Sequence, residues 1–147
     1  MDLKEISELL TPFTADLSAH QLRQVSSYMA LLLKWNARIN LTALRDEKSI
    51  LTRHFGESFF LARHLPESPD LTDIGSGSGF PGIPVKIARP AIALTLVEGQ
   101  QRKATFLREV LRALDLDAEV KNVRAETLPP GASTAVTLRA VEKFESI

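Results

Sequence analysis

The sequence predicts an α/β protein in which a parallel sheet follows a helical N-terminal region. Residues 1 to about 65 have helical patterning and no convincing strand, whereas from Leu71 onward short apolar strands alternate with helices. A loop with three alternating glycines follows the first of these strands. Strands that alternate with helices form a parallel sheet covered on both faces. We therefore expect a helical extension at 1–66 and a sheet region at 67–147.

Helix signals predict two helices in the N-terminal region. Ser18 and Gln21 have the spacing of a capping box, in which each side chain bonds the backbone amide of the other residue. An amphipathic stripe at three- and four-residue spacing follows, and we expect its members to face the core: Leu22, Val25, Met29, Leu32 and Trp35. A second helix is predicted from about residue 47 to residue 65, because Pro66 and Pro69 end it.

Alternating strands and helices are predicted for the remainder of the chain. We expect strands at 71–74, 93–97, 118–123 and 134–138, and helices at 82–88 and 101–114. The second of these helices has an apolar inner face, formed by Ala104, Leu107, Leu111 and Leu114.

The composition is that of an ordinary globular domain, and it excludes several kinds of site. The chain has 147 residues, of which 44% are hydrophobic and 24% charged, and its formal net charge is zero. It contains no cysteine, which excludes disulfides and thiolate metal sites and suits a reducing cytoplasm. No apolar run approaches a membrane span, and no side-chain cluster has metal-ligand spacing. We expect a cytoplasmic monomer without membrane or metal partners.

Basic side chains gather in one part of this otherwise neutral chain. Between residues 86 and 112 they are Lys86, Arg89, Arg102, Lys103, Arg108 and Arg112, against Glu98 and Glu109. A solvated helix face explains such a run most simply. The alternative is a local surface that contacts phosphate groups, since nucleic-acid binding usually depends on basic side chains.

The most informative segment is the loop from Asp73 to Gly82, Asp-Ile-Gly-Ser-Gly-Ser-Gly-Phe-Pro-Gly. Glycines that alternate directly after a strand allow a sharp turn and a close approach of backbone to ligand, because no Cβ intervenes. The amides at the start of the next helix point to the same place. A cofactor therefore fits outside the carboxyl end of this strand.

The loop by itself leaves two cofactors open. Gly77-x-Gly79-x-x-Gly82 satisfies the dinucleotide fingerprint, and Glu98 lies at a suitable distance along the chain to bind a ribose. The tighter series Gly75-x-Gly77-x-Gly79 and the acidic Asp73 favour S-adenosylmethionine. A carboxylate suits a ligand that carries an ammonium and a sulfonium, and it would repel a pyrophosphate. With this cofactor, Glu98 would accept hydrogen bonds from both ribose hydroxyls.

Several motifs, taken in chain order, resemble those of one known family. They are Trp35-Asn36-x-x-x-Asn40-Leu41-Thr42, Arg53-His54-Phe55, the glycine loop continued through Ile83-Pro84, Arg102-Lys103-x-x-Phe106-Leu107-Arg108-Glu109, Arg124-Ala125-Glu126 and Leu138-Arg139-Ala140-Val141. This series resembles the glucose-inhibited division protein B (RsmG) family, the 16S rRNA guanine-N7 methyltransferases. The resemblance covers nearly the whole chain, and the stretch Phe-Pro-Gly-Ile-Pro is far more specific than a glycine motif.

The resemblance implies a class I S-adenosylmethionine-dependent methyltransferase, a Rossmann-like fold, with an N-terminal helical extension. It implies methyl transfer to N7 of a guanine in the 530 loop of 16S rRNA, in the small ribosomal subunit. The residues that it implies at the cofactor are Gly75, Gly77, Gly79 and Phe80, with Ala125 and Glu126 beside the adenine. Arg139 would face both the cofactor and the target base, as the catalytic residue.

The sequence also departs from the pattern of the family. Glu57 stands where an aspartate is usual, and Leu138 where a serine is usual. The full sheet of this fold class continues beyond its fourth strand, whereas this sequence stops just after Arg139. We therefore expect a truncated sheet with a bare edge.

Other polar and aromatic residues have a structural explanation that we prefer to a functional one. We expect Asn36 to bond the turn that follows it, at Asn40-Leu41-Thr42, rather than a ligand. For His54 we expect a hydrogen bond to a neighbouring group. Tyr28 and Trp35 are expected to pack in the core rather than to stack on bases.

Three alternatives to an rRNA methyltransferase stay open. A nicotinamide-dependent oxidoreductase could use the dinucleotide fingerprint, but that function leaves Asp73 and the Phe80-to-Pro84 stretch unexplained. A non-catalytic module could bind S-adenosylmethionine or RNA without transferring a methyl group. An enzyme of the same fold could also methylate another acceptor, because the class I fold serves many substrates.

Overall fold

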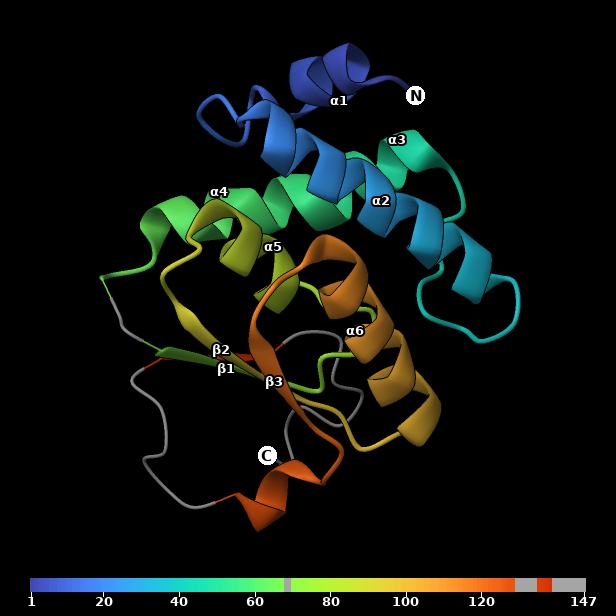
Figure 1. Ribbon diagram of the computed structural model, residues 1–147, viewed down its shortest axis with the longest axis vertical. Coiled ribbons are helices and arrows are strands. Elements are labelled where there is room, and N and C mark those ends of the chain that lie inside the picture. Colours follow the sequence, from blue (N-terminus) through green and yellow to red (C-terminus); the bar gives the residue numbers. More distant parts are fainter. Residues whose placement is uncertain (68–69, 129–134, 139–147) are drawn as a thin grey trace.

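The computed structural model describes residues 1–67, 70–128 and 135–138 (Figure 1). The helices are α1 (Leu3–Leu10), α2 (Ala19–Asn36), α3 (Glu47–Ser49), the π-helix η1 (Ile50–Gly56), α4 (Glu57–His64), α5 (Gly82–Ala88), α6 (Gln101–Leu114) and the 3-10 helix η2 (Ala125–Thr127). The strands are β1 (Asp70–Ile74), β2 (Ala93–Val97), β3 (Ala118–Lys121) and β4 (Val136–Leu138).

Helix α2 begins at the predicted capping box. The Ser18 hydroxyl accepts the Gln21 backbone N–H at 3.1 Å, and the Gln21 side chain accepts the Ser18 N–H at 2.8 Å. Four members of the predicted stripe are buried, namely Leu22, Val25, Met29 and Leu32. Trp35, the fifth, is half-buried against the same core.

The predicted second helix is continuous from Glu47 to His64, but its middle is a π-helix, which the sequence did not indicate. Asp46 starts the segment, since its carboxylate accepts the Ser49 N–H at 2.9 Å. Gly56, at the end of the wide turn, lies against the Phe13 ring, and a Cβ there would stand 2.7 Å from that ring. The wide turn leaves Phe55 fully buried while His54 stays half-exposed.

The four described strands form one parallel sheet in the order β3-β2-β1-β4. The α/β class with a parallel sheet is therefore confirmed. Helices α5 and α6 and the strand β2 lie where they were predicted. Strand β3 ends at Lys121, two residues earlier than expected, and residues 129–134 and Arg139 lie outside the described residues.

The helices stack on the sheet in layers. Figure 1 shows α5 and α6 above the strands, with α2 and α4 packed outside them. Two contacts show that helices α2 and α6 run antiparallel. Gln24, near the start of α2, bonds the carbonyl of Leu114 at the end of α6, and Trp35, near the end of α2, packs on Phe106 near the start of α6. The inner face of α6 is buried as predicted. One continuous core thus joins residues 1–66 to the sheet, and the boundary at residue 66 stays a prediction.

The basic run between residues 86 and 112 is not a single solvated face, which corrects the simpler interpretation. Lys86 is buried, and its ammonium donates to the carbonyls of Pro90 at 2.7 Å and Ile92 at 2.6 Å. Arg89 reaches the carbonyls of Leu65 and Pro66, both at 3.4 Å. These two residues therefore stabilise the fold.

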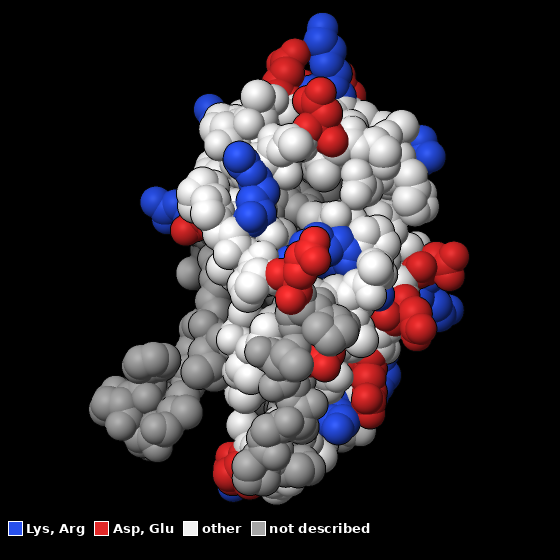
Figure 2. Space-filling view, turned by 90° about the vertical axis from the view of Figure 1, so that its left-hand side faces the viewer, with Lys and Arg blue, Asp and Glu red and all other residues white. Residues whose placement is uncertain are grey.

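On the face shown in Figure 2, basic and acidic side chains are interspersed, and neither sign dominates a large area. Within the part of the chain that the structure describes, no helix is both long and apolar enough to cross a membrane. The same residues contain no group of histidines and carboxylates arranged to hold a metal ion.

Candidate cofactor-binding site

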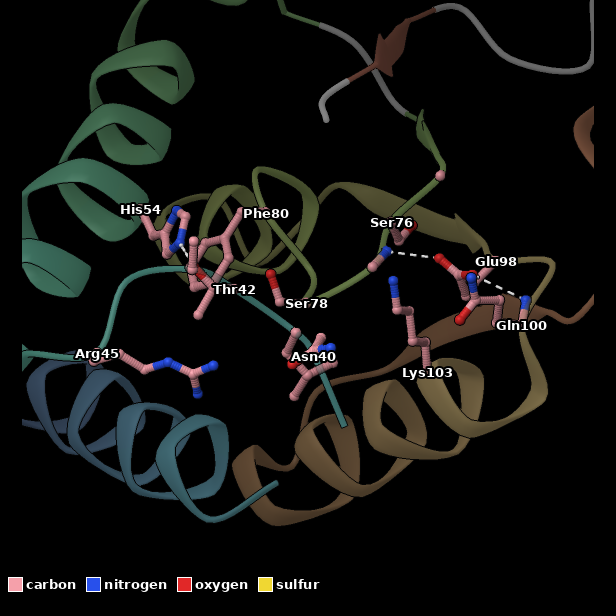
Figure 3. Close-up of a pocket in the computed structure, with 14 residues that line it drawn as sticks. Asn40, Thr42, Arg45, His54, Ser76, Ser78, Phe80, Glu98, Gln100 and Lys103 are labelled. Atoms are coloured by element: carbon pink, nitrogen blue, oxygen red, sulfur yellow. Dashed lines mark hydrogen bonds between the residues drawn. The ribbon is translucent and has the colours of Figure 1, made fainter. Parts of the chain in front are cut away.

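A cavity of about 770 Å³ opens beside the carboxyl ends of β1 and β2 (Figure 3). The glycine loop and the start of α6 line one side of it, and the segment after α2 together with η1 lines the other. The lining residues are Asn40, Leu41, Thr42, Ala43, Arg45, His54, Gly75, Ser76, Gly77, Ser78, Phe80, Glu98, Gln100 and Lys103. Of the predicted site residues, Gly75, Gly77, Phe80 and Glu98 therefore meet at one cavity.

Gly77 leaves the loop open to the cavity. Its φ is 54°, in the left-handed region that side chains rarely adopt, and a Cβ there would meet only the Gly75 carbonyl, at 3.8 Å. The loop is anchored below, because the amides of Gly75 and Ser76 both donate to the Val97 carbonyl. The backbone at Gly77 can therefore be approached closely by a ligand.

Glu98 fixes the cavity floor from the end of β2. It is only 7% exposed, and its two carboxylate oxygens accept the backbone N–H of Gly77 at 2.8 Å and of Gln100 at 2.9 Å. Figure 3 shows these two hydrogen bonds on one side of the cavity. Because a carboxylate offers about four acceptor sites, Glu98 can still accept donors from a ligand.

Gly79 serves the packing of the loop rather than the cavity wall. Its φ is 97°, and a Cβ there would collide with the Tyr28 hydroxyl and lie 2.9 Å from the Ile83 side chain. The Tyr28 hydroxyl donates to the Ser78 carbonyl at 2.5 Å. The alternating glycines thus divide into two roles, which their spacing alone could not reveal.

Asp73 lies beneath the loop and is fully buried. Its carboxylate accepts the Thr137 hydroxyl at 2.9 Å and the Gly82 N–H at 3.3 Å. The carboxylate thus faces β4 and the start of α5, and Asp73 is not among the residues that line the cavity. The cofactor contact predicted for Asp73 stays a prediction.

A stack of rings closes the opposite side of the cavity. Phe80 stacks on the rings of both Tyr28, at 5.1 Å between centroids, and His54, at 4.7 Å. His54 Nε2 lies 2.7 Å from the Thr42 hydroxyl, the pair drawn with a dashed line in Figure 3. The predicted hydrogen-bonding role of His54 is confirmed, yet its ring also lines the cavity.

The turn that carries Thr42 is held from the end of α2. The Asn36 side-chain oxygen accepts the N–H of Leu41 at 2.9 Å and of Thr42 at 3.1 Å, and its amide nitrogen donates to the Thr42 carbonyl at 3.1 Å. The predicted role of Asn36 is thereby confirmed. Asn40 and Thr42, held by this turn, lie in the cavity wall.

Sequence reasoning missed several residues of the wall as site residues. Figure 3 shows the Lys103 ammonium and the Arg45 guanidinium directed into the cavity, with Glu98 on the side of Lys103. Asn40, Thr42 and His54 belong to motifs that carried the family resemblance. That resemblance was therefore the available signal for their role.

Two further predicted residues, Ala125 and Glu126, do not line this cavity. They form the turn η2 after β3, half-buried and exposed respectively. Arg139 lies outside the described residues. The roles predicted for these three residues stay predictions.

Comparisons with known proteins agree with the geometry. The family model described as GidB, rRNA small subunit methyltransferase G, matches residues 21–147. Over 144 residues the chain is 46% identical to the ribosomal RNA small subunit methyltransferase G of Chloroflexus aggregans, covering 93% of this chain and 60% of that protein. Proteins of the same name are 47% identical in a Roseiflexus species and 44% identical in Xanthomonas euvesicatoria, covering 89% and 82% of this chain. The chain spans about 60% of the length of these curated relatives.

Proposed function

We propose, since the chain belongs to the rRNA small subunit methyltransferase G (GidB) family, that its cavity binds S-adenosylmethionine. We further propose that the bound cofactor methylates N7 of a guanine in the 530 loop of 16S rRNA. The observation that carries the proposal is Glu98, whose buried carboxylate bonds the Gly77 amide and lines the cavity.

The described residues fit this cofactor. A cavity of about 770 Å³ is within the usual range for a small-molecule site. Glu98 can accept the two ribose hydroxyls, and the open backbone at Gly77 permits close contact. Arg45 and Lys103 supply positive charge in the same cavity. Charges of both signs suit a ligand that ends in an amino acid.

A nicotinamide dinucleotide fits less well. A pyrophosphate would need the free amides at the start of the helix after the glycine loop. In this chain the Gly82 N–H already donates to the Asp73 carboxylate, whose negative charge lies directly behind the loop. Electrostatic repulsion at this point argues against the dinucleotide and in favour of a ligand with a sulfonium and an ammonium.

The methyl transfer requires little of the protein beyond the positioning of the donor and the base. When bound, S-adenosylmethionine supplies an activated methyl group. Guanine N7 has a free lone pair, so its attack requires no general base. The rate then depends on holding the base in line with the donor and on a preorganised field. The half-exposed His54 ring, stacked on Phe80 at the cavity wall, is a fixed surface against which an unstacked base can be held.

A calorimetric titration tests the cofactor. The chain is titrated with S-adenosylmethionine and, separately, with NADH. We expect heat only from S-adenosylmethionine, and we expect it to be lost in Gly77→Asp, where a carboxylate would enter the cavity. The variant Ala113→Asp adds the same charge on an exposed position of α6 and serves as the control. Binding of NADH instead would reject the proposal.

Methyl transfer is tested separately, by incorporation of a labelled methyl group into small-subunit RNA. N7 methylation of a guanine in the 530 loop supports the full proposal. Binding of the cofactor without transfer would support the alternative of a non-catalytic module. Transfer to another position or acceptor would retain the enzyme class and replace the substrate.

A further inference from the structure

A groove runs away from the cofactor cavity between α2 and α6. We call it the α2–α6 groove, and it is lined by Leu31, Lys34, Trp35, Arg38, Ile39, Arg102 and Glu109. Its volume is about 460 Å³. Its lining comes from the second half of α2, from the segment that follows α2, and from α6.

The groove and the cofactor cavity form one continuous depression. Between them lies a second hollow of about 440 Å³, lined by Arg38, Ile39, Asn40, Gln100, Arg102 and Lys103. It shares three residues with the groove and the other three with the cofactor cavity. An extended ligand could therefore run from the cavity along the helices without leaving the surface depression.

The charge along this path is positive. Lys34, Arg38, Arg102 and Lys103 line it, and within the described part of the chain none of these four forms an ion pair. The one acidic side chain that lines the groove, Glu109, is bonded by Arg112 at 2.6 Å. The path therefore presents four cations against one neutralised carboxylate, in a chain whose formal net charge is zero.

An aromatic surface lies among these cations. Trp35 is half-buried, and its ring is braced edge-on by Phe106 at 5.6 Å between centroids. Proteins that bind single-stranded RNA combine a basic groove that follows the phosphates with rigid aromatic rings on which bases stack. The α2–α6 groove contains both elements, next to the cavity that would hold the target base.

We propose that the α2–α6 groove binds the RNA strand that flanks the methylated nucleotide. Lys34, Arg38 and Arg102 contact its phosphates, and Trp35 contacts an unstacked base. This inference rests on the proposed function, because it takes the partner of the cofactor cavity to be RNA. The sequence left two interpretations of the basic run between residues 86 and 112 open, a solvated face and a phosphate-contacting surface. For part of that run, this inference favours the phosphate-contacting surface.

Two matched triple variants test the inference. The groove variant is Lys34→Gln/Arg38→Gln/Arg102→Gln. The control variant, Arg23→Gln/Lys48→Gln/Arg108→Gln, makes the same charge change at exposed positions that line none of the described cavities. Binding of a labelled single-stranded fragment of the 530 loop is measured by fluorescence anisotropy at several salt concentrations.

We expect the groove variant to bind the RNA about tenfold or more weakly at low salt, because three phosphate contacts are lost. The slope of log affinity against log salt should fall by about 2, at about 0.7 per phosphate for a single strand. The control variant should match the wild-type chain. Affinity for S-adenosylmethionine, measured by calorimetry, should be the same in all three proteins.

Trp35 gives a second readout, because it is the only tryptophan of the chain. Its intrinsic fluorescence should change when RNA binds to the wild-type chain, and the change should require higher RNA concentrations in the groove variant. An unchanged emission at saturating RNA would place the strand elsewhere and overturn the inference.

The outcomes separate this inference from the proposed function. Failure of the wild-type chain to bind S-adenosylmethionine would reject the proposed function. Intact cofactor binding together with equal RNA affinity in both variants would reject only the groove. Intact cofactor binding without any binding of RNA would reject the groove and the RNA substrate of the proposed function together. Polyglutamate that competes with the RNA at equal concentration and salt would also reject it, because the groove would then be a site for an acidic protein.

Discussion

The hydroxyl of Tyr28 donates a hydrogen bond of 2.5 Å to the carbonyl of Ser78, and so joins the helical region to the middle of the glycine loop. Both groups are buried, and fifty positions separate them along the chain. Ser78 lines the cavity, whereas Tyr28 does not. A residue outside the cavity wall therefore helps to determine the shape of the loop.

Tyr28→Phe should keep the ring packing on Phe80 and remove this hydrogen bond. A buried carbonyl that loses its donor costs about 1–3 kcal/mol, so we expect the free energy of unfolding in urea to fall by about that amount. Affinity for S-adenosylmethionine should also fall, because the loop is less well fixed. Phe59→Leu, a core change in α4 away from the loop, should lower stability without changing affinity. Equal affinities in wild type and Tyr28→Phe would show that the loop holds its shape without the tyrosine.

Gly79→Ala and Gly77→Ala should differ although both glycines have positive φ. At Gly77 the new methyl group meets open space, and we expect a loss of about 1–2 kcal/mol from the backbone conformation alone. At Gly79 the methyl group collides with the Tyr28 hydroxyl, which adds about 1–3 kcal/mol of overpacking. Thermal and urea unfolding of the two variants measure the difference. Similar losses would mean that Tyr28 can move aside.

Glu98→Gln should weaken binding of S-adenosylmethionine about tenfold or more, since hydrogen bonds to a charged acceptor are about twice as strong as neutral ones. The glutamine amide cannot accept both backbone N–H groups, so stability should fall by about 1–3 kcal/mol as well. The exposed Glu119 of β3 offers the matched control Glu119→Gln. Calorimetry that found unchanged affinity in Glu98→Gln would remove Glu98 from the site.

Lys86→Met should affect stability alone. The buried ammonium satisfies the carbonyls of Pro90 and Ile92, and their loss of a donor should cost about 1–3 kcal/mol. The exposed Arg108 gives the control Arg108→Met, which should change stability by less than about 0.5 kcal/mol. Cofactor affinity should be unchanged in both. A large loss of affinity in Lys86→Met would link this lysine to the cavity.

Local signals in the sequence were sufficient for most of the fold. The capping box of Ser18 and Gln21, the apolar stripes and the prolines are short-range features, and the helices and strands that they predict are present. The π-helix Ile50–Gly56 was missed because the apolar periodicity of the segment does not distinguish it from an α-helix. Gly56, at its end, lies against Phe13, a contact between segments far apart in the sequence.

The candidate site was predictable only where it depends on the ends of the predicted strands. The glycine loop and Glu98 follow directly from strand ends, so their meeting at one cavity could be expected. The roles of Gly79 and Asp73 depend on which distant group each one packs against. Asp73 bonds Thr137, for example, from a strand 64 positions away.

The stack of Phe80 on Tyr28 and His54 has a consequence for natural variation in this protein. Six of the fourteen residues that line the cavity belong to residues 1–66, so the pocket exists only while the helical region is docked on the sheet. A ligand bound there would stabilise both regions together, by a free energy that grows with the logarithm of its concentration. Loss-of-function alleles should therefore include substitutions scattered along the first third of the chain, at positions such as Phe13 and Asn36. In these alleles the sequence of the glycine loop would be intact.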